Sequence, residues 1–352
     1  MSLSNFLLEF FLPDPTREFR SRCRDLEGKC KQGCSNSCVE LFKLREKEFW
    51  EEQSFSFKQE ARDWLLRAIK SGSREAILLY GKHYYESDKN ECVHLLEGLI
   101  QSGDNEASHL LAKRLLENWD NIQDKTQAIE RYKALESRGD KRAALILAEQ
   151  YFYGAGGHVE RDHSVALSFL KRADTESPEV NRLIGSILLA GISEAGTKMK
   201  PSPQNALVHF LKAANSGPTG CASSQYLAGI IILKHPTLGS VHEAVNLLTR
   251  ANTSGAALAS YRLCMLYHEG TVIEKNKEEA YFYALVAEQG LSDAISAQWG
   301  FMRDQWLING DDTYLEYTSA LSQAAKTKKE LQSTLEDKDI ENIEKKVKSL
   351  RA

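Results

Sequence analysis

The chain has 352 residues, with 45 basic and 49 acidic side chains and a formal net charge of -4. A single closed core rarely grows this large, so we expect either several domains or an elongated repeat array. The charge is nearly balanced and no long run of one sign occurs, which argues against nucleic acid and anionic membranes as partners. The few prolines fall mostly outside the helical runs, as in an ordered helical protein.

The N-terminal stretch MSLSNFLLEFFLPDP contains an apolar run. It has no Lys or Arg before the run, Glu9 inside it and no small-residue cleavage site, so we do not expect a secretory signal peptide. No stretch is long and apolar enough to predict a transmembrane helix. The sequence therefore predicts a cytoplasmic protein without membrane insertion, and leaves secretion without a classical signal as an alternative.

Four of the seven cysteines lie close together, at Cys23, Cys30, Cys34 and Cys38. Four thiolates within reach of one another suit a tetrahedral zinc ion. Their intervals of seven, four and four residues differ, however, from the C-x2-C or C-x4-C pairs of zinc sites. We interpret them as reduced cysteines that fill small-residue positions of a divergent first repeat, and keep a metal site as the weaker alternative.

A small residue recurs every 31 to 40 residues, where the second helix of a hairpin is expected to end. This spacing suits two helices and two turns. Glycine favours the position because many helices end with a residue in the left-handed conformation. The positions are Gly33, Gly72, Gly103, Gly139, Ser177, Gly217, Gly255 and Gly290.

The expected first helices each carry a central apolar residue that is followed by a small one. They cover residues 75–85, 106–116, 142–152, 179–189, 222–232 and 258–268. The small residues are Gly81, Ala112, Ala148, Gly185, Ala228 and Cys264. Because small side chains let helices approach closely, this recurrence predicts packed helix pairs. The expected second helices cover residues 91–100, 127–135, 164–173, 205–214, 243–251 and 277–289.

Two copies show the repeat most completely, at residues 143–173 and 259–290. The recurring residues in the second copy are Ala259, Leu263, Tyr267, Gly270, Val272, Asn276 and Ala280, and in the first copy Tyr151, Gly154, Gly156, Val159, Asp162 and Ala166. This pattern resembles the Sel-one-like subfamily of tetratricopeptide-type repeats, over about residues 15–305. The resemblance implies an all-α fold, a right-handed α/α superhelical solenoid of about eight stacked helix hairpins.

We therefore divide the chain into three regions. Residues 1–56 form divergent N-terminal helices with the cysteine cluster, residues 57–310 form the solenoid, and residues 311–352 form C-terminal capping helices. The cap is expected to begin with a helix over residues 313–326 that covers the end of the solenoid. A heptad-like spacing from Ile340 to Leu350 is too short for an independent coiled coil, so a monomer is favoured over a dimer.

The resemblance also implies a non-enzymatic adaptor or scaffold that binds a protein or peptide in a concave groove, without a cofactor. If the groove of tetratricopeptide repeats carries over, residues two and five positions after each central apolar residue face the partner. These are Lys82, Tyr85, Lys113, Leu116, Glu149, Phe152, Ser186, Leu189, Met265 and His268. Alternatively, the residues five positions later belong to the core between hairpins.

Two other functions stay open. One is a bacterial effector that is secreted without a signal peptide. The other is a binder of cell-wall or penicillin-type ligands, as in a cysteine-rich bacterial branch of these repeats, where paired cysteines at the spacing of Cys30 and Cys38 form disulfides. This resemblance makes a Cys30–Cys38 disulfide the first alternative to reduced cysteines, ahead of a metal site, although the missing signal peptide and the odd total of seven cysteines weigh against it. Ser168 and Lys171 match the S-x-x-K pattern of penicillin-interacting enzymes, but they fall within an expected helix and lack the companion motifs, so we predict no enzymatic activity.

Overall fold

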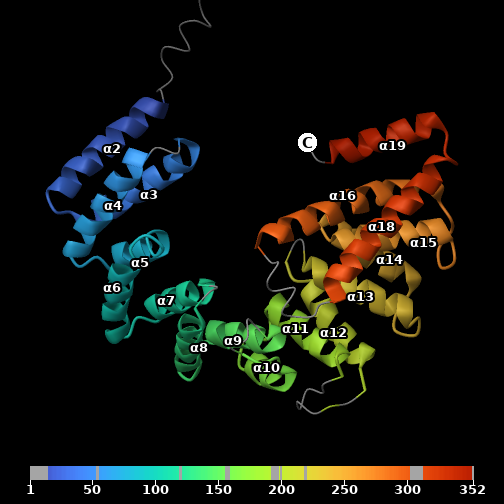
Figure 1. Cartoon of the computed structure of the whole chain (residues 1–352), viewed down its shortest axis with the longest axis horizontal. Helices are drawn as coiled ribbons and strands as arrows, with labels where there is room; N and C mark the ends of the chain where they lie inside the picture. Colours follow the sequence, from blue (N-terminus) through green and yellow to red (C-terminus); the bar gives the residue numbers. More distant parts are fainter. Residues whose placement is uncertain are drawn as a thin grey trace, which may run out of the picture. The chain divides into compact units, whose positions relative to one another are not determined.

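The computed structural model describes residues 15–52, 55–118, 121–154, 159–191, 198, 200–217, 220–301 and 312–350. The regular elements in these residues are all α-helices, as predicted (Figure 1). They are α2 (Pro15–Lys31), α3 (Ser35–Glu52), α4 (Phe55–Lys70), α5 (Arg74–His83), α6 (Lys89–Gln101), α7 (Asn105–Glu117), α8 (Ile122–Glu136), α9 (Lys141–Tyr153), α10 (His163–Leu170), α11 (Pro178–Leu189), α12 (Pro203–Ala214), α13 (Ala222–Lys234), α14 (Val241–Thr253), α15 (Ala257–Glu269), α16 (Lys277–Phe301), α18 (Asp312–Gln332) and α19 (Asp337–Ser349).

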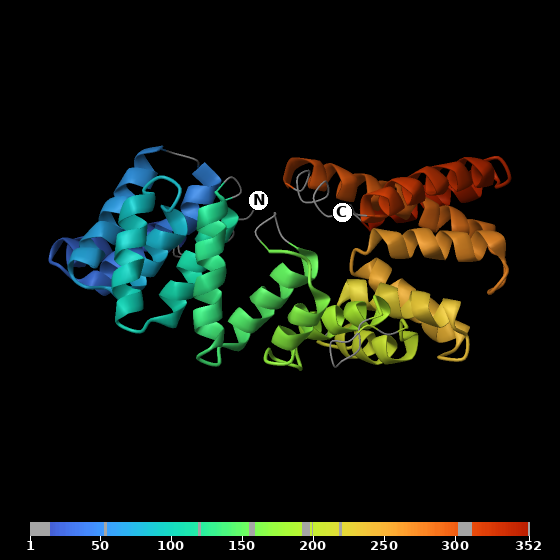
Figure 2. The same ribbon diagram turned by 60° about the horizontal axis from the view of Figure 1, so that its bottom comes forward.

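Consecutive helices pack in pairs, which are the hairpins of a helical-repeat solenoid. The pairs are α3 with α4, α5 with α6, α9 with α10, α11 with α12, α13 with α14 and α15 with α16. In Figure 2 the pairs of the C-terminal part lie as successive layers, from α13 and α14 to α15 and α16. Among the helices described, none is long and apolar enough to cross a membrane.

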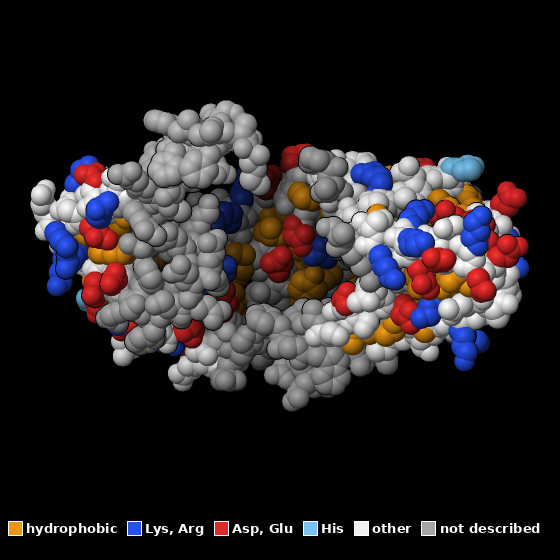
Figure 3. Space-filling view, turned by 90° about the horizontal axis from the view of Figure 1, so that it is seen from above, with side chains coloured by type: hydrophobic (Ala, Val, Ile, Leu, Met, Phe, Trp, Pro, Cys, Tyr) orange, Lys and Arg blue, Asp and Glu red, His pale blue; other side chains and the backbone are white. Residues whose placement is uncertain are grey.

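The chain divides into two compact units, residues 1–131 and 132–352. On the face drawn in Figure 3, charged side chains of both signs are interspersed, as expected from the balanced composition. The region boundaries predicted at residues 56 and 310 stay predictions, and residue 310 lies outside the described residues.

One backbone turn repeats at the junctions between hairpins. Gly103 has a φ of 90°. Its N–H donates to the Ile100 carbonyl at 2.9 Å, and the N–H of Asp104 donates to the Leu99 carbonyl at 3.1 Å. This pair of bonds is a Schellman motif, which requires the left-handed conformation that glycine adopts without strain. The same pair occurs at Gly33, Gly72, Gly139 and Gly255.

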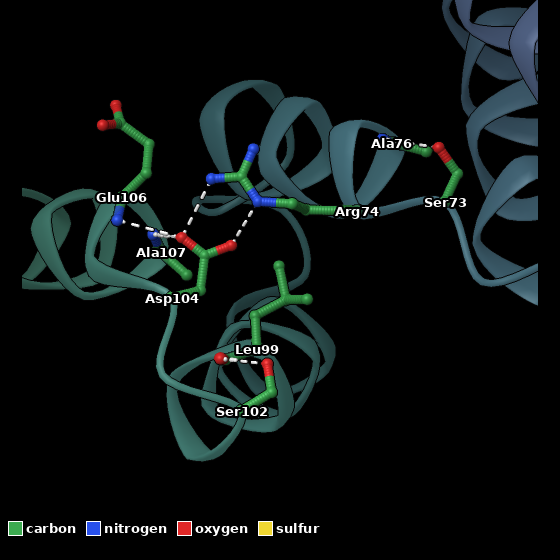
Figure 4. A network of polar contacts seen from close by, with 8 residues as sticks. All are labelled: Ser73, Arg74, Ala76, Leu99, Ser102, Asp104, Glu106 and Ala107. Atoms are coloured by element: carbon green, nitrogen blue, oxygen red, sulfur yellow. Dashed lines mark hydrogen bonds and ion pairs between the residues drawn. The ribbon is translucent and has the colours of Figure 1, made fainter.

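The residue after the glycine also begins the next helix. Asp104 caps α7, because its carboxylate accepts the backbone N–H groups of Glu106 at 3.0 Å and Ala107 at 3.2 Å (Figure 4). Arg74, at the start of α5, donates to both oxygens of the same carboxylate. The side-chain hydrogen bond from Arg74 is the main reason why the pKa of Asp104 is lowered. One carboxylate thus satisfies a helix end and ties two repeats together.

Two of the predicted turn positions are wrong. Ser177 is the N-cap of α11, with a φ of -60°, so it corresponds to Asp104 and not to Gly103. Gly290 lies inside α16, which continues to Phe301. A Cβ added at Gly290 would lie 3.1 Å from the Cβ of Ala257, so this glycine allows close approach of α15 to α16.

The recurring small residues occupy the contact between the two helices of a hairpin. A Cβ added at Gly81 would lie 2.9 Å from Leu96 of α6, and one added at Gly185 would lie 2.9 Å from the ring of Phe210 on α12. In α13 the predicted register is wrong by one residue. There Gly229, not Ala228, is the small residue, since its added Cβ would lie 3.0 Å from Leu248 of α14.

The C-terminal helices cover the end of the last hairpin. α18 contacts α15 and α16, and α19 contacts α16. Ala320 and Ala324 of α18 are buried in a cluster with Ala257 and Leu291. The helix predicted over residues 313–326 is therefore present as α18, and it extends to Gln332.

We expect the same substitution to have opposite effects at two helical glycines. Gly98→Ala should raise the free energy of unfolding by about 0.5–1 kcal/mol, because glycine is a poor helix former and no atom lies within 4 Å of the added Cβ. Gly185→Ala should lower it, because the Phe210 ring must move and overpacking offsets the gain. Urea unfolding followed by circular dichroism measures both, and a stabilised Gly185→Ala variant would contradict the packing argument.

Asp104→Ala should lower the free energy of unfolding at pH 7 by roughly 1–2 kcal/mol, the typical loss for an N-cap. Because the pKa of Asp104 is lowered in the folded chain, its contribution is present above the unfolded value of about 3.9 and is lost as pH falls through the folded value. Thermal unfolding from pH 7 to about pH 3 should show the difference from wild type shrinking. Glu106→Ala is the control, and an equal deficit at every pH would refute the assignment to Asp104.

Candidate functional site

Helices α9 and α11 carry four residues of the predicted partner-binding set. Glu149 and Phe152 lie on α9, Ser186 and Leu189 lie on α11, and all four side chains are half-buried. The two helices contact each other within the second unit. We call the surface formed by Glu149, Phe152, Tyr153, Glu179, Arg182 and Ser186 the α9–α11 face.

Arg182 joins the two helices of this face. Its Nε donates to the carboxylate of Glu179 at 3.0 Å, and a terminal nitrogen donates to the Tyr153 hydroxyl at 3.1 Å. The side chain of Arg182 is only 17% exposed, so its charge is held against Glu179 with limited solvent. Ser186 lies one turn further along α11, and its hydroxyl donates to the Arg182 carbonyl at 3.0 Å.

Glu149 is the carboxylate of this face whose charge is poorly compensated. Burial is the main reason why its pKa is raised, and the negative charge of Glu179 adds to the effect. Arg182 acts in the opposite direction without reversing the shift, since it already pairs with Glu179. Protonation of Glu149 would remove this unfavourable charge, and a cation from a binding partner would neutralise it.

An aromatic cluster borders Glu149. The rings of Phe152 and His163 stack with centroids 5.1 Å apart, and Phe152 meets Tyr153 edge to face at 4.8 Å. Burial, followed by the charge of Arg161, lowers the pKa of His163, so its ring is neutral at pH 7. Tyr153 is 42% exposed. The face therefore offers aromatic surface beside an acidic group.

The predicted residues on α15 lie under α18 instead of facing solvent fully. The Thr327 hydroxyl is 3.9 Å from the sulfur of Met265, and His268 Nε2 is 3.9 Å from a carboxylate oxygen of Glu330. Both contacts are made within the chain. Met265 and His268 consequently belong to the contact between the last repeat and its cap.

The predicted residues of the first unit are divided between surface and core. Lys82 and Lys113 are exposed, and Leu116 is half-buried. Tyr85 is only 3% exposed, and burial raises its pKa to about 12. For Tyr85 the alternative of a core position agrees with the structure.

The sequence analysis missed Tyr153, Glu179 and Arg182. Tyr153 lies one residue beyond the predicted strip, and the spacing rule had no way to select it. Glu179 and Arg182 were recognisable as an i, i+3 ion pair on one helix face. Their contact with α9, however, depends on how two repeats stack.

The N-terminal cysteines differ from the prediction. Cys30 and Cys38 form a disulfide, so the interpretation of these two as reduced cysteines is wrong. Cys23 is buried, and Cys34 is exposed outside the disulfide. In the part of the chain that the structure describes, no group of three or more cysteine, histidine or acidic side chains is arranged to hold a metal ion.

The S-x-x-K match does not form a reactive pair. Ser168 is exposed, and its hydroxyl donates to the Val165 carbonyl of its own helix at 2.7 Å. Lys171 is also exposed, at the C-cap of α10. A nucleophilic serine of this type needs a neighbouring base to accept its proton, and this hydroxyl instead bonds to a carbonyl.

We expect Glu149→Gln to stabilise the chain at pH 7. The raised pKa means that the folded state disfavours the ionised side chain. The protonated Glu149 side chain stabilises the fold fully below its unfolded pKa of about 4.3, and this stabilisation is lost as pH rises through the folded pKa. Glu149→Gln should therefore raise the free energy of unfolding relative to wild type only above about pH 4.3. Thermal unfolding at pH 7 and near pH 4 measures the difference. Glu179→Gln, which removes the partner of Arg182, should instead destabilise at pH 7, and equal effects of the two changes would contradict this account.

Comparisons with known proteins identify the repeats. The model of the Sel1 repeat matches residues 58–73, 141–173, 186–218 and 257–287. A Sel1 repeat protein from Oxalobacter formigenes superimposes with a TM-score of 0.58 at 20% identity, over 79% of this chain and 78% of that one. No curated protein sequence matches the chain.

Two further solved structures are less similar. One is c5321, a protective antigen of uropathogenic Escherichia coli strains with an SLR fold, at 15% identity and a TM-score of 0.31, over 93% of this chain and 94% of that one. The other is the immunity protein Pa5087 from Pseudomonas aeruginosa, at 18% identity and a TM-score of 0.35, over 64% of this chain and 81% of that one. The chain is an α-helical solenoid, and four stretches of it match the Sel1 repeat.

Proposed function

We propose that the chain is a non-enzymatic scaffold that binds a protein or peptide at the α9–α11 face. Sel1 repeats generally act as protein-interaction modules, which supports the class of function. The observation that carries the choice of face is the half-buried Glu149 carboxylate near Arg182, whose guanidinium is already paired with Glu179. Burial raises the pKa of Glu149, in agreement with this arrangement. A carboxylate that is unfavourable in the free chain becomes favourable when a partner supplies a cation.

The chemistry of the face suggests the kind of partner. A lysine or arginine side chain that reaches Glu149 would neutralise a charge that Arg182 leaves poorly compensated. Tyr153 and Phe152 would cover the aliphatic part of that side chain, since aromatic residues favour contact with cations and with apolar surface. We therefore expect a segment in which a basic residue is flanked by apolar ones.

The proposed surface is shorter than the groove predicted from the sequence. Because α18 covers Met265 and His268, the partner is expected to engage α9 and α11 without reaching the face of α15. Lys82 and Lys113 stay exposed in the first unit and are candidates for a separate contact.

A second candidate is a scaffold of the same kind that works outside the cytoplasm. The Cys30–Cys38 disulfide favours it, because such bonds persist mainly in oxidising compartments. Trapping thiols with an alkylating agent in intact host cells distinguishes the two locations. A fully reduced Cys30 and Cys38 would favour the cytoplasm, and a quantitative disulfide would favour the exported scaffold.

The experiment that tests the proposed face compares three purified chains in affinity capture from host extract: wild type, Glu149→Lys with Phe152→Ala, and Val208→Ala. Val208 is a control because it is 53% exposed on α12, a helix that contributes no residue to the face. A partner of the face should be retained by wild type and by Val208→Ala. Calorimetry with that purified partner should then show at least about a tenfold weaker affinity for the double variant, or 1.4 kcal/mol. Equal affinity of all three chains would eliminate the α9–α11 face.

A further inference from the structure

The turn between α2 and α3 holds three cysteines within nine residues. Cys30 ends α2, Cys38 lies in the first turns of α3, and a disulfide joins them. Both are buried, at 2% and 1% exposure. Cys34 lies between them in sequence, is exposed, and is outside the disulfide. A thiol and a disulfide therefore share one turn.

Cys34 occupies the N-cap position of the repeat junction. It follows Gly33 as Asp104 follows Gly103, and its N–H makes the equivalent bond to the Lys29 carbonyl at 3.0 Å. The Ser37 hydroxyl donates to the Cys34 sulfur at 3.1 Å. That bond and the backbone N–H groups of Ser37 and Asn36 lower the pKa of Cys34, and the positive charge of Lys29 adds to the effect. The sulfur thus takes the place of the capping carboxylate, where negative charge is stabilised.

The disulfide is not needed to close this kind of junction. The positions of Cys30 and Cys38 correspond to Asn252 and Ser260 at the turn around Gly255, where the two side chains form a hydrogen bond of 2.5 Å. At the turn around Gly72 they correspond to Ile69 and Ile77. The same backbone turn forms in all three places, so the covalent bond at the first junction is an addition to the fold.

We propose that this turn is a thiol–disulfide exchange site, in which the sulfur of Cys34 attacks that of Cys38 and displaces Cys30. A bond forms between Cys34 and Cys38 as the bond between Cys30 and Cys38 breaks. Cys34 loses its proton to solvent and Cys30 leaves as a thiolate that takes up a proton, so no oxidant or reductant is consumed.

Cys34 and Cys38 are neighbours at the start of α3. The Cys38 N–H donates to the Cys34 carbonyl at 3.2 Å, which places the two residues one helical turn apart. Side chains one turn apart on a helix have Cβ atoms about 5–6 Å apart, more than the roughly 3.5–4.5 Å of a disulfide, so a bond between Cys34 and Cys38 requires the start of α3 to open. Because Cys38 is buried, exchange requires local opening of the turn, of the kind that occurs at helix ends.

The two disulfides differ in what they connect. The bond from Cys30 to Cys38 ties α2 to α3, whereas a bond from Cys34 to Cys38 would join the residue before α3 to the first turn of α3. Exchange therefore removes the disulfide cross-link between α2 and α3, which stay joined by the main chain, without changing the redox state of the chain. The exchange would therefore control how firmly α2 is held against α3.

Trypsin separates the two states in the full-length chain. Cleavage after Lys29, Lys31 and Lys43 yields the peptides CK and QGCSNSCVELFK, because Cys30 lies in the first and Cys34 and Cys38 lie in the second. Exchange is stopped with acid and free thiols are alkylated before digestion. A chain with the starting bond then yields the two peptides cross-linked to each other. The exchanged bond gives alkylated CK and an internally bonded QGCSNSCVELFK, and fragmentation distinguishes any bond between Cys30 and Cys34.

After anaerobic incubation at pH 7.5, wild type is expected to yield a growing fraction of the exchanged peptide until equilibrium. Cys34→Ser should retain only the starting bond, and Ser37→Ala should exchange several-fold more slowly, because it loses the hydroxyl that stabilises the thiolate. Amide exchange of α2 should be faster in wild type than in Cys34→Ser. Recovery of only the starting bond from wild type at all times would overturn the proposal. Equal exchange rates for wild type and Ser37→Ala would contradict the proposed role of the Ser37 hydroxyl in stabilising the Cys34 thiolate.

Discussion

The structure depends on one backbone arrangement, the glycine turn that ends the second helix of one hairpin and begins the first helix of the next. At Gly103 and Asp104 two N–H groups satisfy the last carbonyls of α6, and the carboxylate satisfies the first N–H groups of α7. Helix ends otherwise leave four backbone groups without intrahelical partners. Because both ends are satisfied within two residues, the hairpins follow one another with a fixed turn, and the apolar faces of neighbouring repeats meet.

Ion pairs between neighbouring repeats affect the register of the array more than its stability. They join side chains about one repeat apart in sequence: Lys43 with Glu75, Arg74 with Asp104, Lys89 with Asp124, Arg131 with Glu97, Arg172 with Glu136 and Lys328 with Glu288. An exposed pair contributes about 0–1 kcal/mol, whereas one fully buried leucine contributes roughly 1.5–3 kcal/mol. The pairs therefore add little stability compared with the packed core. Their regular spacing favours the correct register between one repeat and the next.

Local patterns predicted the fold well because each repeat is built from local signals. The helices, the turns at Gly72 and Gly103, and the small residues at Gly81 and Gly185 follow from spacing alone. The errors arose where contacts between elements override such patterns. Gly290 lies inside α16 against Ala257, and in α13 it is Gly229 that lies against Leu248 of α14. The α9–α11 face was half predicted, since Glu149 and Phe152 follow from the helical register, whereas Arg182 joins it through the stacking of two repeats.

The two sites proposed here share a physical feature, which is that a charge or covalent bond is present where the fold does not require one. Other junctions close without a disulfide, and the α9–α11 face would be more stable without the charge of Glu149. A repeat array tolerates such departures because each repeat contacts mainly its neighbours, so a local cost does not spread through the chain. The regular junctions hold the array together, and the exceptions among its repeats are the places where function is best sought.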